Sequence, residues 1–220
     1  MQAKSNILAF DTSAAHCAAA LLCDQTLVSE RCEAMAKGQA EHLMPLLEEL
    51  LRDARLNWRD LDAIGVGVGP GNFTGLRISV SAARGLAMGL NIPAVGVPCL
   101  EAQGFLGGDE TPVISVSAAP RDQYYADLIQ DGQGRGPKLL ADNALPSYPT
   151  RAEPYVLGHR AEELGAMHGL QVIKPAFPLA EGIARLAMRR MRSTTDRPKP
   201  LYVRAADAAP PRDPAPVILP

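Results

Sequence analysis

GVGVGPGNFTGLR, residues 65–77, is the most unusual stretch of this 220-residue sequence. It overlaps a strand-like segment at residues 62–68 and runs into a helix predicted for residues 73–90. Glycine permits positive φ and a close approach of the backbone to other groups. A strand, a glycine-rich turn and a helix start can together bind an anion. The glycine spacing matches neither GxGxxG nor GxxxxGK[ST], so a tight structural turn is an equally good interpretation.

The segments that precede this turn predict an antiparallel meander. Apolar strands are expected at residues 7–10 and 17–23, separated by the polar turn DTS at residues 11–13. A third, half-exposed strand is expected at residues 26–33. Leucines at helical spacing predict a helix that is opened by residues 37–39 and runs to about residue 55. A short strand at 94–97 and a helix at 100–106 follow the glycine turn. The order β-β-β-α-β-α-β-α predicts a mixed sheet with helices on its faces, the ribonuclease H-like unit.

Similarity between two segments of the sequence predicts that this unit is duplicated. ILAFDTSAAHCAAALLCD, starting at Ile7, has the same shape as VISVSAAPRDQYYADLIQD, starting at Val113. Two such units in tandem give an actin-like α/β fold, although a chance likeness of two hairpins stays open. The second unit is short, so we expect a truncated second lobe. The expected parts are a ribonuclease H-like lobe at residues 1–107, a smaller lobe at 108–207 with helices at 160–167 and 182–192, and a Pro-rich, extended or disordered tail at 208–220.

Composition and charge indicate a globular protein of the cytoplasm. Hydrophobic residues make up 47% of the chain, and the formal net charge is −2. Such a balance supplies no basic field that would draw in tRNA or a membrane surface. No apolar run approaches the length of a membrane span, and the N-terminal stretch is too short for a signal peptide. The four cysteines form no CxxC pair, so buried, reduced thiols are expected.

Asp11, Thr12 and Ser13 are the candidates for chemistry in the first lobe. In actin-like ATPases an acid at the end of a buried strand positions metal and phosphate, which makes these residues a candidate vestigial phosphate turn. The alternative is an Asx turn that only ends the strand. Val116 is followed by Ser117, so the second lobe offers no matching acid. No histidine pair at i, i+4 and no nucleophile–base pair is visible, so we expect no metal and no catalytic group.

The helix predicted at residues 73–90 is apolar or small around its whole circumference. Only Arg77 and Arg84 interrupt this character, and they lie together on one flank. A helix of this kind is buried on two sides, and its own sheet can cover only one of them. The second cover is either the leucine-rich helix at 39–55, as ordinary internal packing, or another subunit that binds both helices.

Three segments carry a resemblance to a known family. ILAFDTS at 7–13, GVGPGNFTGLR at 67–77 and GLA at 85–87 resemble the TsaB (YeaZ) family, and the match is strong over residues 5–105. The related enzyme family, TsaD, carries a metal-binding H-x-x-x-H pair where this chain has Cys99 and Gln103. A thiol and an amide cannot replace two imidazoles there. The resemblance therefore implies a non-catalytic scaffold without a cofactor, although weak nucleotide binding stays open; the rival is an actin-like ATPase or small-molecule kinase.

The resemblance also implies partners. TsaB-like proteins support TsaD-like subunits, which transfer a threonylcarbamoyl group to an adenosine of tRNA. A TsaE-like ATPase joins that complex, tRNA is reached only through the complex, and the protein forms a homodimer when alone. No membrane is involved. By this analogy the partner interface comprises Leu43, Leu46, Leu47, Leu50, Ile78, Ala82 and Gly85.

Overall fold

A five-stranded mixed sheet forms the centre of the first lobe in the computed structural model, which describes residues 5–108, 111–147 and 152–203. The strand order is β3-β2-β1-β4-β5. The first three strands pair antiparallel, and β4 and β5 run parallel to β1. The strands are β1 (Asn6–Asp11), β2 (His16–Cys23), β3 (Thr26–Ala34), β4 (Ala63–Gly67) and β5 (Ala94–Val97). The predicted meander and its parallel extension are confirmed.

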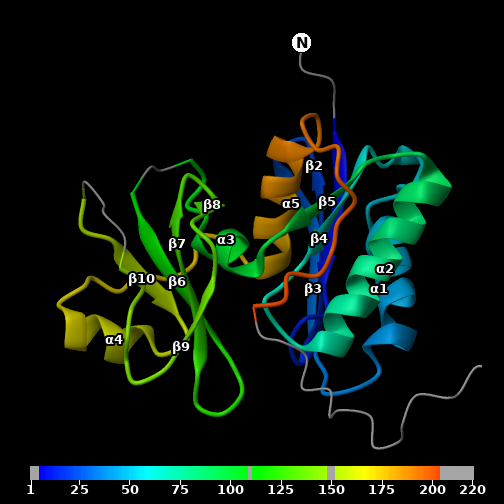
Figure 1. The fold of residues 1–220 in the computed structure, drawn as a ribbon. Coiled ribbons are helices and arrows are strands. Elements are labelled where there is room, and N and C mark those ends of the chain that lie inside the picture. The colour runs from blue at the N-terminus through cyan, green and yellow to red at the C-terminus, as the bar shows by residue number, and fades with distance from the viewer. Residues whose placement is uncertain (1–4, 109–110, 148–151, 204–220) are drawn as a thin grey trace, which may run out of the picture.

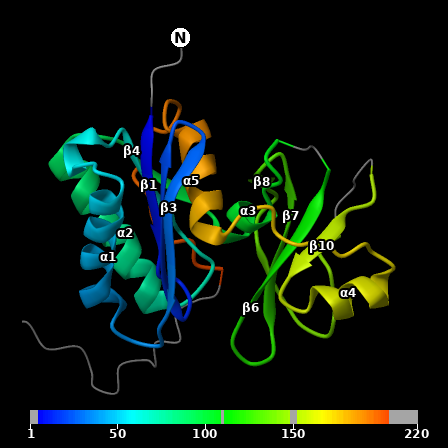
Figure 2. The same ribbon diagram turned by 180° about the vertical axis from the view of Figure 1, so that it is seen from behind.

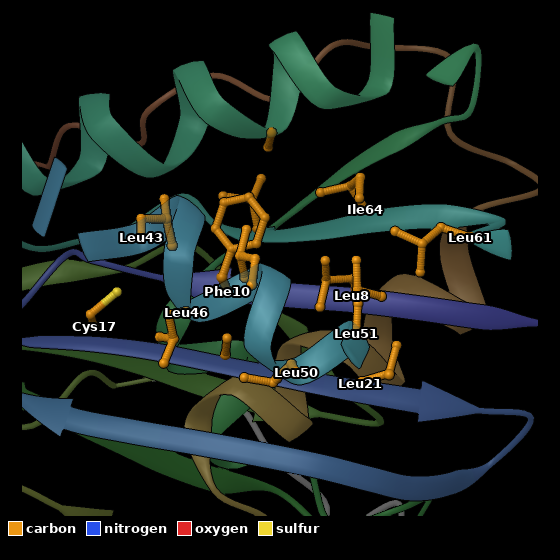
Figure 3. Packing of buried hydrophobic residues seen from close by; sticks show 14 of the residues in the cluster. Leu8, Phe10, Cys17, Leu21, Leu43, Leu46, Leu50, Leu51, Leu61 and Ile64 are labelled. Atoms are coloured by element: carbon orange, nitrogen blue, oxygen red, sulfur yellow. The ribbon is translucent and has the colours of Figure 1, made fainter. Parts of the chain in front are cut away.

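Two helices cover one face of this sheet (Figure 1). They are α1 (Gln39–Asp53) and α2 (Phe73–Leu90), with the short 3₁₀ turn η1 (Trp58–Asp60) between α1 and β4. Five leucines of α1 are buried. Four of them are labelled in Figure 3, packed among the side chains of the sheet: Leu43, Leu46, Leu50 and Leu51. One side of α1 therefore closes the main core, as burial of apolar area requires.

The second lobe repeats the topology of the first. Its sheet has the order β10-β6-β7-β8, with β9 also paired to β7. The β6–β7 hairpin matches β1–β2, and β10 lies parallel to β6 as β4 does to β1. Val172 forms a parallel bridge to Val156 of β10, which is the position that β5 has beside β4 in the first lobe. The elements are β6 (Val113–Ala118), β7 (Tyr124–Gln130), β8 (Gln133–Gly134), β9 (Lys138–Leu140), β10 (Tyr155–Gly158) and α4 (Ala161–His168). The predicted duplicated, actin-like fold is confirmed.

Two helices are exchanged between the lobes. Helix α3 (Cys99–Gly104), which follows β5, packs against β6 and β7 of the second sheet. Helix α5 (Leu179–Arg190), which follows the second lobe, returns to the open face of the first sheet and contacts β1, β2 and β4. Both helices therefore lie between the two sheets (Figures 1 and 2).

This exchange corrects the predicted division at residues 107 and 108. Ile183, Ala184 and Ala187 of α5 belong to the same buried cluster as Ile7 and Ala9 of β1. The small side chains of α5 let the helix approach closely, because a Cβ added at Gly65 would lie 3.0 Å from that of Ala187. Residues 179–203, assigned from sequence to the second lobe, therefore complete the first. The predicted tail at 208–220 lies outside the described residues.

Within the described ranges, no helix has both the length and the apolar character that crossing a membrane requires.

All four cysteines are free, and Cys17 and Cys99 are buried. Cys32 is exposed because it lies on the edge strand β3, so the expectation that every thiol is buried is wrong at this position.

Candidate functional site

The glycine turn interlocks with the end of β1. A Cβ added at Gly67 would lie 2.1 Å from Oδ1 of Asp11, and one added at Gly75 would lie 1.9 Å from the carbonyl oxygen of Thr12. The Thr12 hydroxyl donates to the Gly75 carbonyl at 2.7 Å, and the backbone N–H of Asn72 donates to the Ser13 carbonyl at 2.6 Å. A Cβ at either glycine would collide with the end of β1, with the Asp11 side chain at Gly67 and with the Thr12 backbone at Gly75, so both positions serve close packing.

The start of α2 is capped by its own chain. The Asn72 side-chain oxygen accepts hydrogen bonds from the amides of Thr74 and Gly75, at 2.9 and 3.1 Å. These amides are the groups that an anion at a helix N-terminus would use. A phosphate at this place would have to displace the Asn72 cap.

The Asp11 carboxylate is fully buried and bonded within the first lobe. Its Oδ2 accepts from the amide and hydroxyl of Ser13, at 3.0 and 2.8 Å, and lies 2.8 Å from Nε2 of His16. Its Oδ1 accepts from the Cys99 thiol at 3.5 Å. The structure thus brings Asp11, Thr12 and Ser13 together, but it directs their polar atoms mainly to partners in the same lobe. Nucleotide binding there stays a prediction.

A cleft of about 1050 Å³ lies between the lobes beside this cluster. Ser13 and His16 line it from the first lobe, and Ser117 and Tyr125 line it from the second. Ser117 follows the last parallel pair of β6 as Asp11 follows that of β1, so the two positions are equivalent. The second lobe therefore carries a hydroxyl, Ser117, at the position where the first lobe has the buried Asp11 carboxylate.

Cys99 and Gln103 are both engaged by neighbouring groups. Burial, reinforced by the charge of Asp11, raises the pKa of the Cys99 thiol well above its usual value. The Gln103 amide donates to the Val116 carbonyl at 3.4 Å. Among the described residues, no group of three or more His, Cys, Asp or Glu side chains is arranged to hold a metal ion.

The thiols should differ sharply in reactivity toward iodoacetamide. Burial raises the pKa of Cys17 to about 11, so this thiol and Cys99 should stay unlabelled in the native protein at pH 8. Exposed Cys32 should be alkylated first, as peptide mass spectrometry would show. In denaturant all four thiols should react. Alkylation of native Cys99 at the rate of Cys32 would contradict the burial of Cys99.

The four leucines proposed for the partner interface do not reach the surface. Leu43, Leu46, Leu47 and Leu50 are at most 1% exposed. They belong to the cluster that includes Phe10 and other side chains of the first sheet (Figure 3). The prediction that these four leucines form the interface is wrong, because the first sheet already covers the leucine face of α1.

The outer side of α2, in contrast, is open. Gly85 and Gly89 are exposed, and a Cβ added at either would meet no atom within 4 Å. Met88 is 79% exposed, and Ile78 and Ala82 are half-buried beside the glycines. An apolar and small-residue helical face of this kind allows close approach of another helix.

Comparison with known proteins finds related sequences and solved structures over most of the chain. Residues 32–136 match the family described as "TsaD: tRNA N6-adenosine threonylcarbamoyltransferase". An uncharacterised protein of Mycobacterium tuberculosis (strain ATCC 25618 / H37Rv) is 33% identical over 211 residues, which cover 94% of this chain and 95% of that protein. The structure of YeaZ from Pseudomonas aeruginosa superimposes with a TM-score of 0.70 at 25% identity, over 90% of this chain and 99% of the other. "tRNA threonylcarbamoyladenosine biosynthesis protein TsaB" of Escherichia coli (strain K12) is 33% identical over 132 residues, which cover 58% of this chain and 57% of that protein.

The chain belongs to the TsaB/YeaZ family. Membership agrees with the three motifs that first indicated it. The structure adds what the glycine-rich motif does: Gly67 and Gly75 receive the end of β1, and Asn72 caps α2. Sequence reasoning missed His16 and Cys99 as partners of Asp11, because neither shares a recognisable spacing with it.

Proposed function

We propose that this TsaB-family chain is the non-catalytic scaffold subunit of tRNA threonylcarbamoyladenosine biosynthesis, and that it binds and supports a TsaD-like catalytic subunit. The proposal depends mainly on the outer side of α2. Gly85, Gly89 and Met88 are uncovered there, although the opposite side of the helix packs on its sheet. Exposed apolar helical surface of this kind marks protein–protein contacts. The family relationship supplies the process.

The cluster around Asp11 supports the non-catalytic part of this proposal. The Asp11 carboxylate already holds Ser13, His16 and Cys99, and Ser117 stands at its counterpart in the second lobe. An ATPase or kinase of this fold needs carboxylates that face the cleft and hold a metal–phosphate group. The geometry therefore favours a scaffold over the kinase alternative.

The partner surface that we propose consists of the half-buried and exposed residues of α2, not the leucines of α1. Ile78, Ala82 and Gly85 remain in it from the sequence-based set. We also propose that a TsaE-like ATPase joins the complex, that the chain forms a homodimer when alone, that tRNA is reached only through the complex, and that the protein acts in the cytoplasm.

Co-expression with the TsaD-like subunit of the same organism tests the function. Affinity capture of that subunit should retain the chain, and the two should co-elute in size-exclusion chromatography. The chain alone should form no threonylcarbamoyladenosine on tRNA, whereas its addition should raise formation by the TsaD-like subunit. Separate elution of the two proteins, or modification by the chain alone, would contradict the proposal.

A further inference from the structure

A basic flank runs along α2 beside its small-residue side. Arg77 and Arg84 are the only charged residues of the helix, both are exposed, and α2 contains no acid. At 100° per residue they lie within about 20° of each other around the axis, and Phe73 and Met88 fall within about 60° of the same line. We call Phe73, Arg77, Arg84 and Met88, together with Tyr202, the arginine flank.

The arginine flank has no compensating charge within the described part of the chain. Arg77 stacks 3.8 Å above the centre of the Phe73 ring and donates to the Tyr202 hydroxyl at 3.3 Å. Neither arginine forms an ion pair with an acid in residues 5–108, 111–147 or 152–203. Arg84 has no polar partner there at all, so its guanidinium is free to bind an external group.

The apolar members of this flank are also unusually exposed. Five large hydrophobic side chains are exposed in the described residues, and three of them, Phe73, Met88 and Tyr202, belong to the flank. Phe73 is 37% and Tyr202 45% exposed, and the two rings stack with centres 4.9 Å apart. Aromatic residues, methionine and arginine are the types that are enriched at protein interfaces.

We infer that the arginine flank determines partner specificity, by selecting a TsaD-like subunit whose contacting helix carries carboxylates opposite Arg77 and Arg84. The inference rests on the proposed function and names the chemistry of its partner. A guanidinium offers a planar fork that matches a carboxylate with two hydrogen bonds. The neighbouring small residues bring the partner helix close, and the unpaired charges then fix which helix is accepted.

Arg84→Glu is the decisive variant, because Arg84 makes no contact on which the fold depends. With the full chain and the TsaD-like subunit, its dissociation constant should rise roughly tenfold or more. The dissociation constant of Arg84→Lys should lie between those of the wild type and Arg84→Glu, because lysine keeps the positive charge but lacks the planar guanidinium. The wild-type affinity should fall with added salt more steeply than that of Arg84→Glu.

Arg59→Glu in η1 is the matched control, because it makes the same charge change at another exposed arginine. Equal weakening by both variants would overturn the inference, since net charge would then be the cause. Unchanged affinity in Arg84→Glu, with association lost in Ile78→Glu, would also overturn it while leaving the scaffold function intact. Loss of tRNA binding by Arg84→Glu with full retention of the partner would assign the flank to RNA and overturn it as well. Failure of the wild-type pair to associate would instead refute the proposed function.

Discussion

Gly75→Ala should lower the melting temperature of the isolated chain by about 10 °C. The added Cβ would lie 1.9 Å from the Thr12 carbonyl oxygen, which is backbone and cannot rotate away. Relief would require breaking the Thr12–Gly75 hydrogen bond and moving the end of β1 away from α2. Overpacking of this kind costs about 3 kcal/mol or more. For a chain of this length each kcal/mol corresponds to about 2–4 °C, as thermal unfolding followed by circular dichroism would show.

Gly89→Ala is the control for this prediction, because it lies in the same helix with no atom within 4 Å of the new Cβ. Alanine is favoured over glycine in a helix by about 1 kcal/mol, so this variant should melt slightly higher than the wild type. The two substitutions are chemically identical and differ only in what surrounds them. If both variants shifted the melting temperature upward, the interlock of the glycine turn with β1 would be wrong.

Local sequence patterns were sufficient for most elements of the first lobe. The helix predicted at 73–90 coincides with α2, because Asn72 caps its start and Asn91 ends it in the left-handed conformation. The first two strands of the meander were found as short apolar runs bounded by polar turns, and the third from its rough alternation. Strands β8 and β9 were missed, since two or three residues carry no readable period.

Long-range packing was the part that the sequence could not supply. The leucine arc of α1 correctly indicated a buried face, but periodicity does not say whether a sheet or a partner covers it. The return of α5 to the first sheet was missed for the same reason. It depends on the fit of Ala187 against Gly65, two residues that are far apart in the chain.

At the candidate site, too, local features could be predicted from sequence and long-range contacts could not. The turn at Asp11 was recognised as polar and strand-ending, which the bond from the Ser13 amide to its carboxylate confirms. Its engagement with Cys99, 88 residues away, could only come from the fold. The arginine flank was visible in sequence as two arginines on one side, but its lack of acidic partners required the structure.

Gly85→Glu should weaken association with the TsaD-like subunit by about 3–5 kcal/mol while leaving the isolated chain at least as stable as the wild type. The glutamate would point into open space in the free protein, and it is a better helix former than glycine. In the complex the same carboxylate would be buried against a helix without a partner charge, which is strongly unfavourable. Titration calorimetry and thermal unfolding measure the two effects separately.

Ile78→Glu and Ala82→Glu should weaken association to a similar extent but should also destabilise the free chain, because both side chains pack partly against the main core. Ala166→Glu, at an exposed position of α4 in the other lobe, is the matched helical control and should leave association unchanged. Gly85→Glu is therefore the variant that isolates the interface from the fold. If it bound the TsaD-like subunit as tightly as the wild type, the open side of α2 would not be the partner surface, whatever the other two variants did.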